Sequence, residues 1–175
     1  MKHSEHPLVV FTHCPRCGSE NFGIHNEKSR HCADCGFTYY INPSAATVAL
    51  IVNGRGELLC VRRGKEPAMG TLDLPGGFCD MDETAEEGVA REVMEETGLS
   101  VTKTHFLFTI PNLYLYSGMT IHTMDLFFCC EVSDDTVATA ADDAAECLWI
   151  PIEDIRPDDF GLLSVRDGVK RFLQK

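Results

Sequence analysis

Residues 74–99 of the chain read LPGGFCDMDETAEEGVAREVMEETGL, and this stretch decides the fold. Its second half predicts a helix over residues 84–97. Thr84 and Glu87 have the spacing of a capping box at the start, and Gly98 suits the left-handed residue that ends a helix. The apolar positions repeat every four residues, at Ala85, Val89 and Val93. One buried face is therefore expected along this helix.

Three glutamates stand together on another face of the predicted helix. Glu92, Glu95 and Glu96 lie at i, i+3 and i+4, within an arc of about 100°, where like charges repel one another. A solvated acidic face is the simpler interpretation, but the turn at residues 74–77 precedes the glutamates, and its two glycines let the backbone approach closely. Such a turn can offer a carbonyl to a metal and an amide to a phosphate oxygen. Hard cations such as Mg²⁺ and Mn²⁺ prefer oxygen ligands, so this pattern predicts a catalytic metal site.

From Gly77 to Leu99 the sequence resembles the Nudix box, G-x5-E-x7-R-E-U-x-E-E-x-G-U with U aliphatic, and it matches every specified position. The resemblance implies that three carboxylates and one carbonyl bind catalytic Mg²⁺ or Mn²⁺, namely those of Glu92, Glu95, Glu96 and Gly76. Gly77 is the box residue expected to contact the substrate. The resemblance also implies an ion pair between Glu83 and Arg91 that holds the loop to the helix. We expect loss of this pair to misplace the metal ligands.

An acid outside the box is expected to act as a base or as a further metal ligand. In the family such an acid often precedes a short strand that carries an aromatic residue, and Glu146 stands three residues before Trp149. Asp142 and Asp143 are the competing candidates, and all three side chains also suit a solvated acidic loop. We take Glu146 as the catalytic candidate.

Two C-x-x-C-G turns precede the box, at residues 14–18 and 32–36. The two-residue spacing lets both thiols of a turn reach one tetrahedral ion, and the glycine permits the tight backbone turn. The expected zinc ligands are Cys14, Cys17, Cys32 and Cys35. Four thiolates leave no open position for water, so the Zn²⁺ is expected to be structural. The sequence thus predicts a zinc ribbon at residues 1–42 and a Nudix hydrolase domain at residues 43–175.

The remaining pattern predicts strands around the central helix. Strand-like runs occur at residues 22–27, 37–41, 46–52, 57–62, 101–110, 121–132 and 148–151. Residues 53–56 have the composition of a hairpin turn, and apolar residues at mostly helical spacing predict a closing helix within residues 160–173. This order indicates a mixed α/β (α+β) fold rather than a βαβ repeat. Together with the Nudix resemblance it implies an α/β/α sandwich with a small N-terminal zinc ribbon.

Composition limits the class of partner. The formal net charge is -12, which argues against a sequence-independent grip on nucleic acid. An acidic enzyme that acts on a polyanion needs cations, so we expect bound metal with help from Arg62 and Arg63, the candidate substrate-binding pair. No apolar run is long enough to span a bilayer, and the start lacks the apolar core of a signal peptide, so a cytoplasmic protein without a membrane partner is expected. The nine cysteines, an odd number, favour reduced thiols over a disulfide framework.

The order of zinc ribbon and Nudix domain is similar to that of bacterial NADH pyrophosphatases. Those enzymes carry S-Q-P-W-P-F-P-x-S beginning ten residues after the box, where this chain has TIPNLYLYS at residues 109–117. Pro111, Tyr114 and Ser117 persist, whereas the tryptophan and the two later prolines are absent. The preference for NADH is therefore not carried over. Tyr114 is the candidate to stack on a base, although packing against the ribbon suits its ring equally.

We expect metal-dependent hydrolysis of the diphosphate linkage in a nucleoside diphosphate derivative, such as NADH, ADP-ribose or a related dinucleotide, with release of a nucleoside monophosphate. The alternative is a Nudix-like nucleotide-sensing regulatory or binding protein without hydrolase activity. That alternative predicts a broken acidic helix or a basic surface, and the sequence has neither. The similar enzymes also imply a homodimer with the ribbon near its interface.

Overall fold

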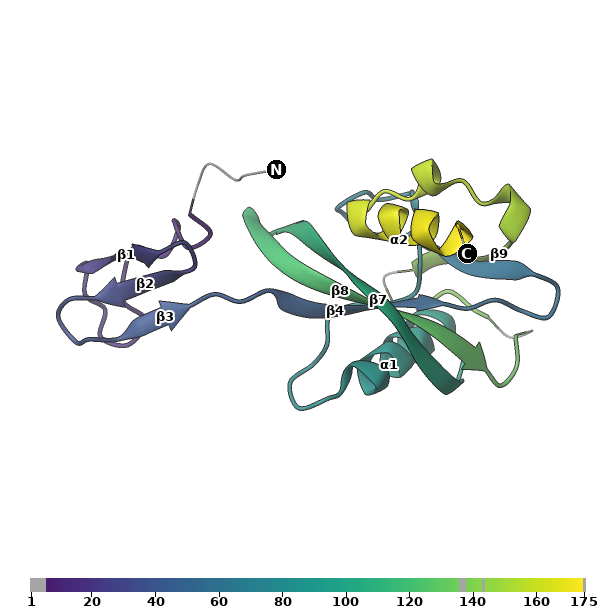
Figure 1. The fold of residues 1–175 in the computed structure, drawn as a ribbon, viewed down its shortest axis with the longest axis horizontal. Helices are drawn as coiled ribbons and strands as arrows, with labels where there is room; N and C mark the ends of the chain where they lie inside the picture. Colours follow the sequence, from purple (N-terminus) through teal and green to yellow (C-terminus); the bar gives the residue numbers. More distant parts are fainter. Residues whose placement is uncertain (1–5, 136–137, 143, 175) are drawn as a thin grey trace.

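The computed structural model describes residues 6–135, 138–142 and 144–174 as a small three-stranded unit joined to a larger unit (Figure 1). The small unit contains β1 (Phe22–Asn26), β2 (Ser29–Cys32) and β3 (Thr38–Tyr40) in one antiparallel sheet. β1 and β3 occupy the predicted runs at residues 22–27 and 37–41. β2 was not predicted, because its sequence, Ser-Arg-His-Cys, has no apolar alternation.

The first sheet of the larger unit has β8 (Met119–Val132) at its centre. β4 (Ser44–Leu50) lies parallel to β8 on one side, and β7 (Val101–Tyr116) lies antiparallel on the other. β7 and β8 are longer than the predicted strands. They are joined by a tight turn at Ser117 and Gly118, which both have positive φ angles. Most of the segment that aligns with the NADH pyrophosphatase signature is therefore regular strand.

The second sheet has β5 (Glu57–Arg63) at its centre, between β6 (Leu72–Asp73) and β9 (Ala144–Pro151), both antiparallel to it. The predicted hairpin turn between β4 and β5 forms: the Asn53 amide donates to the Glu57 carbonyl (3.0 Å) and the Leu59 amide to the Ile51 carbonyl (2.9 Å), but the paired part of this hairpin is short. β4 pairs along its whole length with β8, so β4 and β5 belong to different sheets and meet through one bridge, between Val52 and Leu58.

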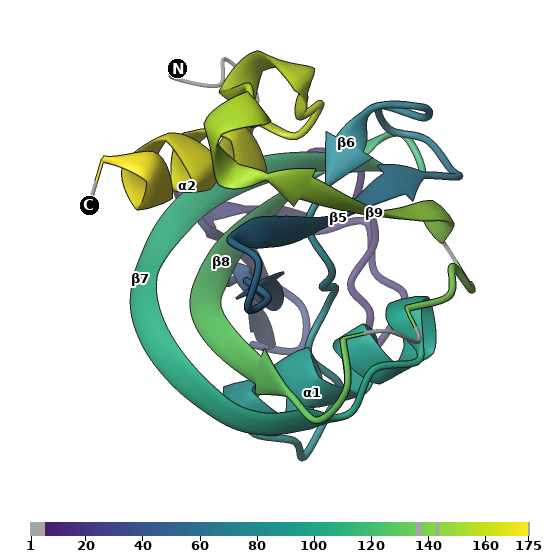
Figure 2. The same ribbon diagram turned by 90° about the vertical axis from the view of Figure 1, so that its right-hand side faces the viewer.

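Two α-helices cover the strands from opposite sides (Figure 2): α1 (Ala85–Thr97) and α2 (Leu163–Leu173). Side chains of β4 point alternately to the two helices. Val48 belongs to the core cluster that includes the buried residues of α2, whereas its neighbour Ala49 belongs to the cluster that includes those of α1. This arrangement is the predicted α/β/α sandwich.

α1 begins and ends as the sequence predicts. The Thr84 hydroxyl accepts a hydrogen bond from the Glu87 amide (3.2 Å), and the Glu87 carboxylate accepts one from the Thr84 amide (2.8 Å). Gly98 follows the helix with a φ of 71°, in the left-handed region. Val89 and Val93 are fully buried against the strands. Because these valines fix the rotation of the helix, the glutamates lie on a defined face.

The chain between β9 and α2 forms two short 3₁₀ helices, η1 (Ile152–Asp154) and η2 (Pro157–Asp159). Within the described ranges no helix has the length and apolar character that crossing a membrane requires.

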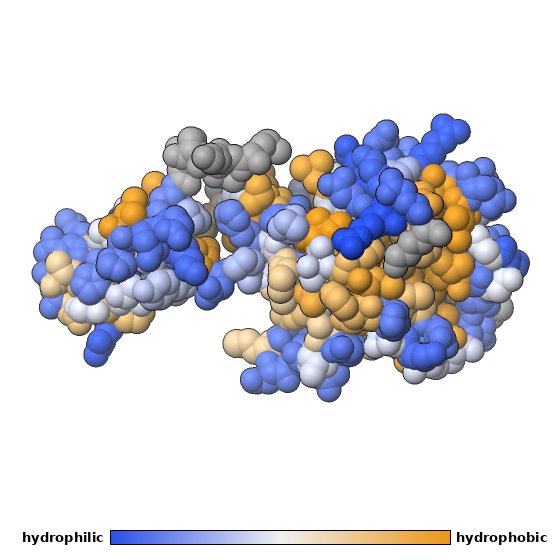
Figure 3. All heavy atoms as spheres, in the orientation of Figure 1, coloured by the Kyte–Doolittle hydropathy of each residue, from blue (hydrophilic) through white to orange (hydrophobic). Residues whose placement is uncertain are grey.

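Hydrophobic side chains gather on the surface over β7 and β8 (Figure 3). The large exposed apolar residues of these two strands are Phe106, Leu115, Tyr116 and Met124. The homodimer expected from the resemblance stays a prediction.

Candidate active site

The loop before α1 lies against β4 as a short extended segment. The Pro75 carbonyl accepts a hydrogen bond from the Ala49 amide (2.7 Å). The Gly77 carbonyl accepts one from the Thr47 amide (2.8 Å). Since carbonyls alternate in direction along extended backbone, the intervening Gly76 carbonyl faces away from β4. A Cβ on Gly76 would lie 2.1 Å from the Thr47 carbonyl oxygen, so this close approach requires glycine.

The same loop touches the acidic face of α1 at two points. The Gly76 amide donates a hydrogen bond to Glu96 Oε2 (3.1 Å), and the Glu96 side chain is almost completely buried. A Cβ on Gly77 would lie 2.5 Å from the carboxylate of Glu92. The two glycines therefore bring backbone against two of the three box glutamates.

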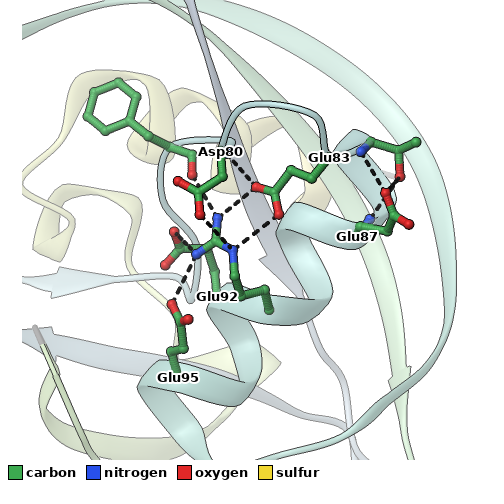
Figure 4. A network of polar contacts seen from close by, with 8 residues as sticks. Asp80, Glu83, Glu87, Glu92 and Glu95 are labelled. Atoms are coloured by element: carbon green, nitrogen blue, oxygen red, sulfur yellow. Dashed lines mark hydrogen bonds and ion pairs between the residues drawn. The ribbon is translucent and has the colours of Figure 1, made fainter.

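Arg91 connects the loop to the helix through one guanidinium (Figure 4). It donates hydrogen bonds to Glu83 from Nη2 (2.7 Å) and from Nε (3.1 Å), and Nη2 also donates to the Phe78 carbonyl (3.0 Å). Its Nη1 donates to Glu92 Oε1 (2.9 Å) and to Glu95 Oε2 (3.0 Å). The hydrogen bonds from Arg91 lower the pKa of Glu83, so this carboxylate stays ionised. Glu83 and Arg91, the expected ion pair, thus lie in direct contact.

The acidic face of α1 has the properties of a cation site. Carboxylate oxygens of Glu92 and Glu95 both reach a single nitrogen of Arg91, so two of the three glutamates already converge on one positive charge. Burial raises the pKa of Glu92, because a charged carboxylate is poorly solvated there. With Glu96 and the Gly76 carbonyl these groups supply oxygen donors of the kind that Mg²⁺ and Mn²⁺ prefer, but the ligand oxygens of the three glutamates do not all lie within 4.8 Å of one another.

A cavity of about 330 Å³ opens beside this face, with walls from both sheets, the glycine loop, α1 and the start of α2. The box glutamates line it together with four aspartates, Asp73, Asp80, Asp125 and Asp142. Among the described residues of the lining, Arg63 carries the only positive charge. The Thr47 hydroxyl, also in the lining, is buried without a hydrogen-bond partner in the described part of the chain. A polyanion therefore needs added cations to enter.

The two candidate arginines of β5 lie in different surroundings. Arg63 lines the cavity and donates from Nη1 to Asp73 Oδ2 (2.6 Å). Burial raises the pKa of Asp73, and the adjacent guanidinium opposes that shift. Arg62 instead donates to Glu146 Oε2 (3.0 Å) and to the Gly70 carbonyl (3.1 Å). Arg62 and Glu146 are cross-strand partners on β5 and β9, and neither is among the described residues that line the cavity.

Tyr114 and Asp142 both line the cavity. The Tyr114 ring meets Phe78 edge to face, with centroids 5.8 Å apart. It also lies 6.5 Å from the ring of Tyr116, in a stacked orientation, so the alternating tyrosines do project from one face of β7. Of the competing acids, Asp142 is in the cavity wall, whereas Asp143 lies outside the described residues.

The second candidate site is the thiol cluster of the small unit. Two Sγ–Sγ distances, Cys14 to Cys35 and Cys17 to Cys32, are both 3.7 Å. A tetrahedron with Zn–S bonds of about 2.3 Å has edges of about 3.8 Å, so the cluster fits zinc. Gly18 and Gly36 follow the two turns with φ angles of 76° and 72°. Among the described residues this is the one group of three or more metal-type side chains whose ligand atoms lie within 4.8 Å of one another.

The model of the NUDIX domain family matches residues 42–169. The chain belongs to the Nudix family. A curated relative of this Nudix protein, the NAD-capped RNA hydrolase NudC of Vibrio cholerae serotype O1, is 25% identical over 152 residues, which cover 87% of this chain and 54% of the relative. The chain spans about half the length of the curated NudC relatives it matches.

Solved structures share the Nudix fold. The Nudix hydrolase from Nitrosomonas europaea superposes with a TM-score of 0.69 at 21% identity, covering 93% of this chain and 90% of that one. The Nudix domain of Shewanella oneidensis NrtR, solved in complex with ADP ribose, has a TM-score of 0.61 at 18% identity, covering 77% of this chain and 89% of that one. At these identities the likeness concerns the fold alone.

Sequence reasoning missed several polar groups in the cavity of this Nudix domain, and the most deeply placed acid among them is on β8. Asp125 on β8 is almost completely buried and accepts hydrogen bonds from Thr123 Oγ1 (2.6 Å) and Asn112 Nδ2 (3.2 Å). It accepts a third from the Ser164 hydroxyl of α2. The available signal was a lone acid directly before the apolar run at residues 126–130. Strand periodicity alone does not show that the acid faces a cavity.

Proposed function

We propose that the chain hydrolyses the diphosphate linkage of a nucleoside diphosphate derivative in a metal-dependent reaction and releases a nucleoside monophosphate. The observation that carries the proposal is the meeting of the glycine loop with the glutamates of α1 at the wall of one acidic cavity. A diphosphate is a polyanion, and it can approach these carboxylates only when cations neutralise them. The cavity volume of about 330 Å³ falls in the range of small-molecule sites.

Glu92, Glu95, Glu96 and the Gly76 carbonyl are the groups that would hold Mg²⁺ or Mn²⁺. When bound, such an ion neutralises phosphate charge and lowers the pKa of a coordinated water. The protein supplies the positions of the ligands: the Gly76 amide orients Glu96, and Arg91 holds the carboxylates of Glu92 and Glu95 toward the loop. If either support were lost, the carboxylates would move away from the positions that metal binding requires.

The substrate contacts follow from the cavity lining. Arg63 and Gly77 are the proposed contacts for the phosphates, and Tyr114 is the proposed aromatic contact for the base. Asp142 is better placed than Glu146 to accept the proton of an attacking water, because of these two acids only Asp142 is among the described residues that line the cavity. We therefore propose Asp142 as the general base in place of Glu146.

The substrate class is proposed from the relatives as well as from the site. NudC relatives are named NAD-capped RNA hydrolases, and the Nudix domain of NrtR has been solved with ADP ribose. Both names point to an adenosine diphosphate linked to a second group. We propose NADH, ADP-ribose and related dinucleotides as substrates. The relatives' name also adds NAD-capped RNA to the candidates, although a net charge of -12 predicts weak contact with the RNA body.

The small unit is proposed to be a structural zinc ribbon, with residues 1–42 as the ribbon and residues 43–175 as the catalytic domain. The four thiols support this role because they complete a tetrahedral shell and leave no ligand position for substrate. The proposed boundary, between residues 42 and 43, falls between two strands, because β3 ends at Tyr40 and β4 begins at Ser44.

A substrate screen tests the proposed function. The purified chain should be incubated with NADH, ADP-ribose, diadenosine polyphosphates, nucleotide sugars and NAD-capped RNA, with Mg²⁺, with Mn²⁺ or with a chelator. We expect release of a nucleoside monophosphate from at least one adenosine-containing substrate and no release with the chelator. Tight binding of ADP-ribose without turnover under any metal condition would favour the nucleotide-sensing alternative.

A further inference from the structure

One part of the cavity wall, which we call the floor, is polar and takes no part in the proposed metal binding. Asp125 and Thr123 on β8 and Asn112 on β7 lie next to one another in the cavity wall. Only 5% of the surface of Asp125 is exposed, and Phe127, two residues further along β8, and Val165, next to its partner Ser164, belong to a core cluster of buried apolar residues. Burying a carboxylate among apolar groups is costly, and the three hydrogen bonds that it accepts offset only part of that cost. Packing alone therefore does not explain why a carboxylate stands at position 125.

The register of the strands fixes where this floor lies relative to the metal-binding face. Phe78 of the glycine loop bridges to Ala46 of β4, and Ala46 is paired in turn with Asp125 of β8. The floor is thus two strand spacings, or roughly 10 Å, from the loop that contacts the glutamates. A ribose can bridge that separation between a diphosphate at the loop and a base at the floor. Phe78 and Tyr114 are the aromatic rings of the cavity lining, and their centroids lie 5.8 Å apart.

The hydrogen bonds inside the floor determine what it can recognise. The hydroxyls of Thr123 and Ser164 each donate their single hydrogen to Asp125, and Asn112 donates one of its two amide hydrogens. The groups left for a ligand include the fourth acceptor position of the Asp125 carboxylate, the Asn112 carbonyl oxygen and the second Asn112 N–H, and the Thr123 oxygen can also accept. Two acceptors beside one donor complement an exocyclic amino group that stands next to an unprotonated ring nitrogen.

We infer that Asp125 and Asn112 read the base of the substrate and select an adenine-type edge, an amino group beside a ring nitrogen, over an oxo base such as hypoxanthine. This inference rests on the proposed function for its substrate, and it goes beyond it by locating base selection on β7 and β8. Hypoxanthine places a carbonyl oxygen where adenine has its amino group. That oxygen would face the Asp125 carboxylate, and two acceptors repel each other.

The test compares two substrates that differ only at this group. kcat/KM is measured for ADP-ribose and for inosine diphosphate ribose, with Mg²⁺, in the wild-type chain, in Asp125→Asn and in Asp167→Asn. We expect the wild type to favour the adenine substrate by at least about tenfold, the effect of one hydrogen bond to a charged group. Asp125→Asn should bring the two values within about threefold, because the amide can turn a donor toward the hypoxanthine oxygen. Asp167→Asn, the same change at an exposed aspartate of α2 outside the cavity lining, should keep the preference.

The outcomes separate this inference from the proposed function. Equal hydrolysis of both substrates by the wild type would overturn base selection while the hydrolase proposal stood. An unchanged ratio in Asp125→Asn, with both rates lowered, would show that Asp125 only supports the packing of β7, β8 and α2. If neither substrate is hydrolysed, ADP-ribose is not a substrate of this chain, and calorimetric affinities for AMP and IMP in the same variants decide base selection. Tighter binding of AMP that is lost in Asp125→Asn would support the inference, and equal affinities would overturn it.

Discussion

At Gly77 the space that a side chain would occupy is already filled by the carboxylate of Glu92, whose atoms lie 2.5 Å from an ideal Cβ. Gly77→Ala must therefore displace that carboxylate or the loop, and we expect at least a tenfold loss of kcat/KM together with a higher Mg²⁺ requirement. Gly54→Ala is the matched control, because nothing lies within 4 Å of its Cβ position. Equal activity of the two variants at low Mg²⁺ would show that the loop does not position Glu92.

Tyr114 tests how the altered strand segment affects selectivity. Without the tryptophan of the similar enzymes, the site should discriminate poorly between groups attached to ADP, so kcat/KM for NADH and for ADP-ribose should agree within about a hundredfold. Since the Tyr114 ring lines the cavity beside Phe78, Tyr114→Ala should weaken the binding of NADH and of ADP-ribose together. Tyr116→Ala, with its more exposed ring, is the control. A preference for NADH beyond about a thousandfold would place selectivity elsewhere.

The site residues differ in how far sequence could find them. The box glutamates and Arg91 are set by spacing along one helix, and their spacing alone places them on one face. Asp125, Asn112 and Ser164 come together from two strands and a second helix, so only the packed fold shows them as a group. Glu146 was predicted from a local pattern, but the pairing of β5 with β9 places it beside Arg62. Sequence spacing does not show which strands pair.

At the scale of elements, α1 depends on its capping box. Thr84→Ala removes the acceptor for the Glu87 amide and should lower the free energy of unfolding by about 1 kcal/mol. Glu87→Ala removes the reciprocal acceptor, so the double variant should cost less than the sum of the single ones. Urea denaturation of the four proteins measures this coupling. Strict additivity would mean that the two hydrogen bonds act independently.

The same cap gives the stability of α1 a pH dependence. The hydrogen bond from the Thr84 amide lowers the pKa of Glu87 in the folded chain, with a further contribution from the Thr84 hydroxyl. Stabilisation by the Glu87 carboxylate is therefore complete above its unfolded pKa of about 4.3 and is lost as the pH falls through the lowered folded value. The stability difference between the wild type and Glu87→Gln should narrow below that range. A difference that grows on acidification would contradict this origin of the shift.

The sequence predicts the bounds of α1 better than it predicts which strands pair. α1 carries its start, stop and buried stripe within one continuous segment, and its observed bounds lie within a residue of those expected. The main partners of β4 and β5 lie far along the chain, so the predicted hairpin between them is limited to a few residues beside its turn. β6 has two residues and no pattern that sequence could detect.

At the scale of the whole molecule, the small unit has little core besides its thiols. Its core cluster consists of Cys14, Cys32 and Phe22, with Cys35 and Phe37 packed against them, and Leu8 and Ser29 are buried outside this cluster. Cys14→Ser should therefore lose zinc and expose the first forty or so residues to proteases, with a smaller loss of activity. Cys129→Ser, on β8, is the control. Protein prepared without chelators that contains no zinc by elemental analysis would exclude the ribbon.

The central claim is that the acidic face of α1 binds the metal that hydrolysis needs. The most direct measurement is the rate of AMP release from ADP-ribose at saturating Mg²⁺ by the wild type, Glu95→Gln and Glu96→Gln, with Glu86→Gln on the first turn of the same helix as the control. We predict that the first two variants stay folded and lose at least about a hundredfold in turnover, while the control keeps its rate. Near-normal turnover by folded Glu95→Gln and Glu96→Gln would contradict the account.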